Sequence, residues 1–264
     1  MAPAIRIIRP TSSSLTLSTA VAGWSGAIGA TAPTNCKIIH FVRHAQGYHN
    51  VDPGIMKEPA GLDAQLTEEG MRQCAQLAET VKDRLRPELI VTSPLTRTCQ
   101  TAALSFGALL QTGVPIVALE AVRETVNFLC DARRPLSTIT AELMARGVNV
   151  DVQAGCTHDH DELWASYERK HGSQVAFQAH RESADLGSLA NRARSAFAWL
   201  GARPEREIVV VSHSAFYWNV LNMGRVTRGA VEDVVDYGGD IEMEGWLAAR
   251  FENCECRTVV VEFL

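Results

Sequence analysis

The stretch that decides the fold is Lys37-Ile38-Ile39-His40-Phe41-Val42-Arg43-His44-Ala45-Gln46-Gly47. A mostly apolar run of six residues leads directly into a polar loop that begins with an arginine and a histidine. A short apolar run bounded by polar and glycine-containing sequence is typical of a buried strand. We therefore predict a buried strand over residues 37–42, with Arg43 and His44 at its carboxyl end.

The same transition from an apolar run to polar residues recurs along the chain. Further strands are predicted over residues 89–91, 115–119 and 207–211. The polar residues that follow these strands are, in turn, residues 93–97, 123–124 and 212–214. A last apolar run over residues 257–263 predicts a final edge or pairing strand.

Helical patterns separate these strands. Thr67 is expected to cap one helix, because a threonine side chain can accept a hydrogen bond from a free N–H of the first turn. Ser93 as N-cap and Pro94 at the first helical position predict a second helix start. A third helix is expected over residues 188–200. Strands that alternate with helices imply an α/β fold, which we expect to be a three-layer α/β/α arrangement around a mostly parallel central sheet.

The domain organisation follows from shifts in composition. Residues 1–35 contain arginines but no acidic side chain and are rich in Ser and Thr. This composition is loosely similar to that of an organelle-targeting peptide, but we interpret it as an N-terminal extension. Residues 36–264 form the predicted α/β domain. Residues 125–185 interrupt the strand–helix pattern, and we interpret them as a small helical cap insertion outside the sheet.

Composition excludes several classes of protein. The chain has 264 residues, of which 46% are hydrophobic and 21% charged, with a formal net charge of −5. These values exclude wholesale disorder, and a negative chain has no general attraction for nucleic acid or an anionic membrane. No stretch approaches the length of a transmembrane helix. The seven cysteines are an odd number and are scattered, which favours reduced thiols and a cytoplasmic location.

Five residues are predicted to meet at one edge of the sheet, because the carboxyl ends of parallel strands lie together. They are Arg43, His44, Arg97, Glu124 and His213. Guanidinium groups offer paired donors to phosphate oxygens, and a neutral imidazole can attack phosphorus. A carboxylic acid can protonate the oxygen that leaves. This set supplies the positioning and charge neutralisation that phosphoryl transfer needs, with no metal and no cofactor.

Five segments of the chain carry a family resemblance. They are Arg43-His44-Ala45-Gln46-Gly47-Tyr48-His49-Asn50, Leu66-Thr67-Glu68-Glu69-Gly70, Ser93-Pro94-Leu95-Thr96-Arg97-Thr98-Cys99-Gln100-Thr101, Arg123-Glu124 and Val211-Ser212-His213-Ser214. In this order and spacing they resemble the histidine phosphatase superfamily, also called the phosphoglycerate mutase-like family. A lone Arg-His pair is weak evidence, whereas five ordered segments are specific.

The resemblance implies roles for the residues that match. His44 would be the nucleophile that becomes phosphohistidine, and Glu124 would be the proton donor. The phosphate pocket would consist of Arg43, Arg97 and His213.

The resemblance also extends to the residues around this set. Asn50 matches the loop asparagine that contacts the phosphate or orders the loop, and the backbone N–H of Ser214 would reach the phosphate. Tyr48 and His49 are candidates for contacts with substrate. The family usually has glycine after each motif histidine, where this chain has Ala45 and Ser214. A positive φ at either position would be strained.

Three functions fit the predicted site residues and the family resemblance. The first is a metal-independent phosphomonoesterase that acts on a small phosphorylated metabolite through phosphohistidine. The second is a phosphoglycerate mutase-type phosphomutase, and the third is a repurposed scaffold with non-hydrolytic chemistry or phosphate-ligand binding. Family mutases usually carry a Tyr-Gly-rich stretch after the acid, whereas residues 125–131 resemble the phosphatase branch. The substrate and the choice between a monomer and a homodimer are left open.

One alternative site lies in the predicted cap. The alternation His158-Asp159-His160-Asp161 could place metal ligands on one side of an extended segment. We interpret it instead as a solvated loop, and we assign no metal to this chain.

Overall fold

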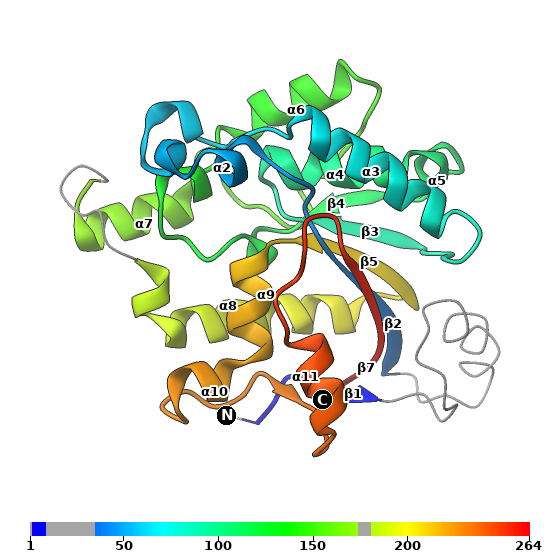
Figure 1. Ribbon diagram of the computed structural model, residues 1–264, viewed down its shortest axis with the longest axis vertical. Helices are drawn as coiled ribbons and strands as arrows, with labels where there is room; N and C mark the ends of the chain where they lie inside the picture. Colours follow the sequence, from blue (N-terminus) through cyan, green and yellow to red (C-terminus); the bar gives the residue numbers. More distant parts are fainter. Residues whose placement is uncertain (1, 9–34, 174–180) are drawn as a thin grey trace.

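A mixed sheet with helices on both faces forms the core of the protein (Figure 1). The computed structural model describes residues 2–8, 35–173 and 181–264. Within these residues the strand order is β4-β3-β5-β2-β7-β1-β6. The strands are β1 (Ile5–Ile8), β2 (Cys36–Arg43), β3 (Leu89–Thr92), β4 (Ile116–Ala118), β5 (Glu207–Ser212), β6 (Val235–Asp236) and β7 (Cys256–Phe263). In the described residues only β7 is antiparallel to its neighbours, so the sheet is mostly parallel, as predicted.

Helices pack on both faces of the sheet and within the segment 125–185. They are α2 (Tyr48–Val51), α3 (Glu68–Val81), α4 (Thr96–Ser105), α5 (Gly107–Gln111), α6 (Leu136–Met144), α7 (Glu162–His171), α8 (Leu186–Ala202), α9 (Ser214–Leu221), α10 (Met223–Thr227) and α11 (Ile241–Leu247). Short 3-10 turns are η1 (Pro53–Lys57), η2 (Pro59–Gly61), η3 (Glu120–Val122), η4 (Leu129–Asp131) and η5 (Glu182–Ala184). Helices α3, α4 and α6 cover one face of the sheet, and α8, α9 and α11 cover the other (Figure 1). This arrangement confirms the three-layer α/β/α prediction.

Neighbouring residues of the central strand β2 pack into two separate hydrophobic cores, because successive side chains of a strand point to opposite faces. Phe41 packs in the core under α8 and α9, where its ring meets Tyr217 edge-on at 5.4 Å. Val42 packs in the other core with Leu77 of α3 and Cys99 of α4. A strand covered on both faces needs apolar residues at consecutive positions. This requirement explains why residues 37–42 are mostly apolar, with Ile38-Ile39 and Phe41-Val42 at consecutive positions.

The register of the central strands sets the position of the motif histidines. Strands β2 and β5 are parallel, and Arg43 pairs with Ser212. The next residue of each strand is a histidine, and the backbone N–H of His44 donates to the carbonyl of Ser212 at 2.9 Å. His44 and His213 therefore leave the sheet side by side at its carboxyl edge.

The N-terminal prediction needs a correction. Residues 1–35 were expected to lie outside the domain, but Ile5–Ile8 form strand β1 between β7 and β6. Ile5 and Ile7 are buried in the core because they alternate toward the α8 face. Strand β1 also gives β7 a second neighbour, so the last strand lies inside the sheet. The rest of the predicted extension, residues 9–34, lies outside the described residues.

The two predicted helix starts have different outcomes. Thr67 caps α3 as predicted, because its side chain accepts from the N–H of Gly70 at 3.0 Å. Helix α4 begins at Thr96, two residues later than the Ser93-Pro94 pair indicated. The carboxylate of Asp63 accepts from both the N–H (2.8 Å) and the hydroxyl (2.6 Å) of Thr96, which replaces a local cap. The hydroxyl of Ser93 is thus available for a contact within the site.

The predicted cap over residues 125–185 contains η4, α6, α7 and η5, and its residues 174–180 lie outside the described part of the chain. Contrary to the prediction, the segment does not stand wholly apart from the sheet, because one isolated bridge connects it to β4. Asp151 forms a parallel bridge to Val117 of β4, and the N–H of Ala118 donates to its carbonyl at 2.8 Å. Helix α6 packs through Ile139 and Leu143 into the same core as α3 and α4.

Candidate active site

The predicted site residues meet around a pocket of about 450 Å³ at the carboxyl edge of β2, β3 and β5. Five predicted residues line this pocket: Arg43, His44, Asn50, Glu124 and Ser214. The other two, Arg97 and His213, are fully buried beside it. The rings of His44 and His213 are 5.1 Å apart between centroids. The structure therefore brings together the whole set that the sequence predicted from four separate segments.

His44 is held with one ring nitrogen free. Its Nδ1 lies 2.7 Å from the carbonyl oxygen of Ala45. Since a carbonyl only accepts, Nδ1 carries the hydrogen and Nε2 keeps its lone pair. The backbone carbonyl of His44 accepts from the N–H of Cys254 (3.2 Å) and from the amide of Asn253 (3.1 Å), which fixes the residue in place. Burial and the nearby Arg97 charge hold the pKa of His44 well below its usual value, so the imidazole is neutral.

His213 presents its second nitrogen to the same space. Its Nε2 lies 2.8 Å from the hydroxyl of Ser93, and its Nδ1 is buried without a hydrogen-bond partner among the described residues. When the Ser93 hydroxyl donates to Nε2, Nδ1 carries the hydrogen and is free to donate to a ligand. Burial and the charge of Arg97 lower the pKa of His213 well below its usual value. This ring therefore offers a neutral donor.

A third histidine of the site comes from the loop after β2. His49 is buried, and its ring centroid lies 5.4 Å from that of His44. Burial, with the charges of Arg97 and Arg43, lowers the pKa of His49 to about 2. Of the two loop residues considered for substrate contact, only His49 lines the pocket. Tyr48 is 54% exposed and lines a different hollow.

The two arginines carry unused donors. Arg43 donates through Nη1 to the carbonyl of Phe251, and Arg97 donates through Nη1 to the carbonyl of Cys130, both at 2.8 Å. The Nε of Arg43 and the Nε and Nη2 of Arg97 are buried without a hydrogen-bond partner in the described parts of the chain. Buried donors left unpaired are costly, especially on charged groups. An anion with several oxygen atoms, such as a phosphoryl group, would satisfy them.

Glu124 is the carboxyl group of the set. Its Oε1 accepts from the backbone N–H of Thr125 (2.8 Å) and of Phe216 (2.7 Å), whereas Oε2 accepts only a longer bond of 3.3 Å from Ala215. Oε2 is therefore the oxygen better able to hold a proton. Burial, together with the charge of Asp131, raises the pKa of Glu124 to about 7. A carboxyl with this pKa can act as an acid or a base at neutral pH.

The remaining predicted positions are also located. The Oδ1 of Asn50 accepts from the N–H of Gly47 at 3.0 Å, so this side chain orders the loop as well as lining the pocket. Ser214 is the first residue of α9 and follows His213 into the pocket wall. Neither Ala45 nor Ser214 has a positive φ. The absence of the usual glycines therefore strains neither position.

Sequence reasoning did not identify several residues of the pocket. Asp131, Trp218 and Arg250 line it, and the Arg250 guanidinium lies 4.7 Å from the centre of the Trp218 ring. Asp131 and Arg250 are in segments with no recognisable periodicity, so nothing in the sequence distinguishes them from surface charges. Thr101 accepts from the N–H of Ala45 at 3.0 Å, which is a role that its place in the matched segment could have suggested.

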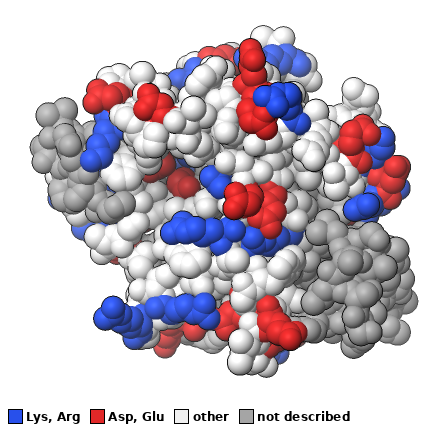
Figure 2. Space-filling model, viewed as in Figure 1, with Lys and Arg blue, Asp and Glu red and all other residues white. Residues whose placement is uncertain are grey.

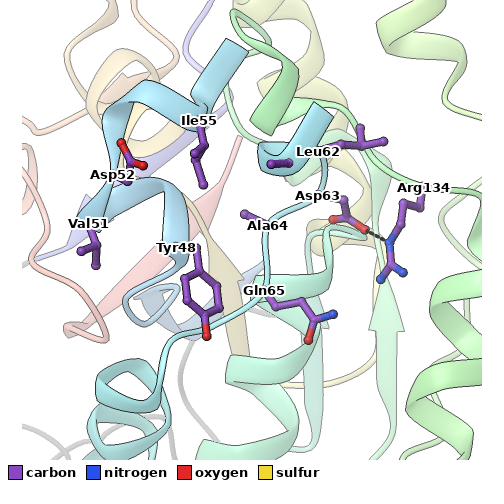
Figure 3. A pocket seen from close by; sticks show the side chains of 10 residues that line it. Tyr48, Val51, Asp52, Ile55, Leu62, Asp63, Ala64, Gln65 and Arg134 are labelled. Carbon is purple, nitrogen blue, oxygen red and sulfur yellow. Dashed lines mark hydrogen bonds and ion pairs between the residues drawn. The ribbon is translucent and has the colours of Figure 1, made fainter. Parts of the chain in front are cut away.

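Outside this pocket, the described surface shows no comparable group of catalytic side chains in the second hollow or on the face in Figure 2. A second hollow of about 620 Å³ is lined by Tyr48 and other residues of the loop that follows, and the only basic side chain that lines it is Arg134, which is bound to Asp63 (Figure 3). The face viewed in Figure 2 carries interspersed basic and acidic side chains. In the described part of the chain, no three His, Cys, Asp or Glu side chains are grouped to hold a metal, and no helix is long and apolar enough to span a membrane.

Comparisons with known proteins find related sequences. Residues 39–127 match the histidine phosphatase superfamily (branch 1). A phosphoglycerate mutase-like protein of Arabidopsis thaliana is 30% identical over 267 residues, which cover 89% of this chain and 88% of that protein. The chain belongs to the histidine phosphatase superfamily. A second Arabidopsis thaliana relative, phosphoglycerate mutase-like protein 1, is 28% identical and covers 89% of this chain and 84% of its own.

The fold of this superfamily member also matches a solved structure. Phosphoglycerate mutase from Bacillus anthracis superposes with a TM-score of 0.50 at 15% identity, over 86% of this chain and 88% of that one. At this identity the likeness concerns the α/β fold alone. Enzymes of the histidine phosphatase superfamily are mutases or phosphatases.

Proposed function

We propose that this protein is a phosphomonoesterase that acts on a small phosphorylated metabolite through a phosphohistidine intermediate on His44. One observation carries the proposal: three buried guanidinium nitrogens of Arg43 and Arg97, which have no hydrogen-bond partner among the described residues, accompany a neutral imidazole whose Nε2 is free. The pocket of about 450 Å³ is of the size that holds a small metabolite.

The first step transfers the phosphoryl group to the enzyme. Nε2 of His44 attacks phosphorus, an N–P bond forms, and the bond from phosphorus to the ester oxygen breaks. Glu124 gives its proton to that oxygen, which leaves as an alcohol. Arg43, Arg97 and the Nδ1–H of His213 donate to the oxygens of the transferring group, because phosphoryl transfer depends on positioning and charge neutralisation.

The second step returns the enzyme to its starting state. Water attacks phosphorus, and the carboxylate of Glu124 takes a proton from this water. The N–P bond breaks, inorganic phosphate leaves, and His44 is again a neutral imidazole. Glu124 thus acts first as an acid and then as a base, for which a pKa of about 7 is suited.

A phosphomutase is the second candidate function, because the two Arabidopsis relatives carry mutase-like names. In a mutase, a hydroxyl group of the substrate replaces water in the second step. The segment Thr125–Asp131, which stands where family mutases usually have a Tyr-Gly-rich stretch, supports the phosphatase. A third candidate is a repurposed scaffold, which would bind phosphate or catalyse different chemistry.

A panel of phosphorylated metabolites, followed by detection of free phosphate and of isomerised ester, separates these candidates. We expect free phosphate from at least one small monoester. Isomerised ester without free phosphate would make the protein a mutase. Binding of inorganic phosphate with no turnover of any ester would support a phosphate-binding scaffold.

Oxyanions that imitate the transition state are expected to inhibit. Vanadate or tungstate should bind the free donors of Arg43 and Arg97 and lower the rate of 4-nitrophenyl phosphate hydrolysis, with competitive kinetics against the ester. A chelator such as EDTA should leave the rate unchanged. Complete loss of activity with EDTA, restored by a divalent cation, would contradict the metal-independent mechanism.

Replacing Glu124 by glutamine tests the proton donor. For an alkyl phosphate, kcat/KM of the wild-type protein should fall as pH rises above about 7, because Glu124 loses the proton that the first step needs. The Glu124→Gln variant should lose this pH dependence and be slower by about 10²–10³-fold. For 4-nitrophenyl phosphate, whose leaving group needs no proton, the loss of kcat/KM should be much smaller. Equal losses for both esters would remove Glu124 from the acid role.

A further inference from the structure

A second carboxylate lies in the pocket, and neither the family resemblance nor the two-step mechanism uses it. Asp131 is buried and lines the pocket together with Glu124. Its Oδ1 lies 3.7 Å from Nη2 of Arg97, on the cap side of the guanidinium. Its Oδ2 accepts from the backbone N–H groups of Asn127 and Phe128, each at 3.0 Å. The carboxylate therefore has a fixed place and orientation.

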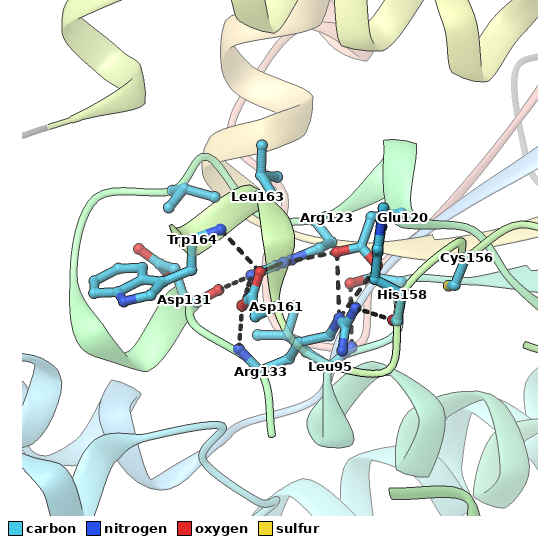
Figure 4. Close-up of polar contacts among 12 residues, drawn as sticks. Leu95, Glu120, Arg123, Asp131, Arg133, Cys156, His158, Asp161, Leu163 and Trp164 are labelled. Carbon is cyan, nitrogen blue, oxygen red and sulfur yellow. Dashed lines mark hydrogen bonds and ion pairs between the residues drawn. The ribbon is translucent and has the colours of Figure 1, made fainter. Parts of the chain in front are cut away.

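The backbone of Asp131 is fixed by an ion-pair cluster (Figure 4). Arg123, which is fully buried, donates to the carbonyl of Asp131 and forms a two-pronged contact with the carboxylate of Asp161. The same guanidinium donates to Glu120 at 2.7 Å. Figure 4 shows these partners converging on Arg123 from the turn after β4 and from the cap. Because Arg123 directly precedes Glu124, one residue connects the two carboxyl groups of the pocket.

A second arginine, Arg133, joins the ion-pair cluster around Arg123. Arg133 donates through Nη2 to the carbonyls of His158 and His160, both at 2.9 Å, and through Nε to Glu120. Asp161 also caps α7 by accepting from the N–H of Trp164 at 2.9 Å. Asp161 is thus structural, which departs from the predicted solvated loop, whereas residues 158–160 of that loop are exposed as predicted.

Several charged groups surround Glu124, each from a different element. Arg43 comes from the end of β2 and Arg97 from α4, and both attract the ionised form. Arg192 from α8 donates to the backbone carbonyl of Glu124 at 3.1 Å and is itself paired with Glu182. Asp131 and Glu124 are buried carboxyl groups that line one pocket, and the charge of Asp131 acts against ionisation of Glu124. Burial raises the pKa of Asp131 as well, whereas the charge of Arg97 and two backbone N–H groups lower it and favour the carboxylate form. When a phosphate ester occupies the donors of Arg97, less positive charge remains to offset Asp131.

We propose that Asp131 is a positioning residue that keeps the proton on Glu124, with its charge held in place by Arg97 and by the Arg123 cluster. This inference rests on the proposed function, since it concerns the acid step of that mechanism. The cap therefore contributes to the chemistry as well as to the pocket wall. Asp131 acts through Glu124 and makes no bond to the ester.

The Asp131→Asn variant tests this role, because asparagine keeps the acceptor for Asn127 and Phe128 but removes the charge. The alkaline limb of kcat/KM for glycerol 3-phosphate, or for a better alkyl substrate from the panel, should move down by about one pH unit. At pH 8 this shift corresponds to a roughly tenfold loss of kcat/KM. For 4-nitrophenyl phosphate the variant should stay within about threefold of wild type, since that leaving group needs no proton.

The matched control is Asp159→Asn in the same cap. Asp159 is exposed and accepts from Ser137 at the start of α6, so it has no contact with the pocket. We expect its pH profile to equal that of the wild-type protein. If Asp131→Asn unfolds, Asp131→Ser provides a second neutral variant whose hydroxyl can still accept from the loop N–H groups.

An unmoved alkaline limb in both neutral variants would overturn the proposal, as would equal losses for the alkyl and aryl esters. The latter result would mean that Asp131 only supports Arg97. Failure of the proposed function gives a different pattern, because Glu124→Gln would then show no dependence on the leaving group. A leaving-group effect in Glu124→Gln without one in Asp131→Asn leaves the function intact and removes Asp131 alone.

Discussion

The His44→Ala variant should lower kcat for 4-nitrophenyl phosphate by about 10⁴-fold or more, as is usual when a covalent nucleophile is removed. The reason is local. Nδ1 of His44 is bound to the carbonyl of Ala45, and the free Nε2 is the atom that attacks phosphorus in the proposed mechanism. Alanine leaves the phosphate donors in place but removes the acceptor for the phosphoryl group. Steady-state rates and acid-labile labelling by a phosphate ester measure the loss.

The fold of this variant should survive, because the carbonyl of His44 and not its ring carries the contacts to Cys254 and Asn253. Circular dichroism and thermal unfolding check this point. His158→Ala is the matched control, since this histidine is exposed in the cap and should keep full activity. Turnover near the wild-type rate in His44→Ala would show that His44 is not the nucleophile.

The Arg123→Met variant should lower the free energy of unfolding by about 3–5 kcal/mol, which is the usual cost of removing one partner of a buried ion pair. Arg123 is fully buried, and its guanidinium donates to Asp161, to Glu120 and to the carbonyl of Asp131. Methionine fills similar space but leaves the mostly buried carboxylate of Asp161 without its main counter-charge. Urea unfolding, followed by fluorescence, measures the difference.

Arg169→Met is the control for the preceding variant. Arg169 also pairs with an acidic residue, Glu162, but both side chains are exposed on α7. Exposed ion pairs contribute little, so the unfolding midpoint should hardly move. An Arg123→Met protein as stable as the wild type would show that the backbone N–H groups of Arg133 and Trp164 are enough to compensate Asp161.

The sequence was informative where local pattern and chemistry coincide. Continuous apolar runs predicted the central strands, because a strand covered on both faces cannot alternate. The rule that parallel strands share a carboxyl edge then brought His44 and His213 together, and the register of β2 with β5 confirms their proximity. The three-layer fold and the family were also predicted correctly.

Contacts between residues that are far apart in the sequence could not be predicted from local sequence patterns. The start of α4 depends on Asp63, which lies more than thirty residues before Thr96. Strand β1 has only four residues and needs β7 and β6 as partners. The Arg123–Asp161 pair joins segments whose sequences give no sign of each other. Each case involves a side chain or strand whose partner is set by tertiary packing rather than by local propensity.

The position of β7 has a consequence for how the protein folds. Strand β7 lies between β2 and β1, so Val42 pairs with Cys256 and Ile5 pairs with Phe263. Contacts of such long sequence separation form slowly, because the chain between them must be closed into a large loop. During synthesis, β2 can have no neighbour on this side until β7 has left the ribosome. The edge that carries His44 is therefore completed late, and a nascent chain should remain without phosphoryl-transfer activity until β7 has joined the sheet.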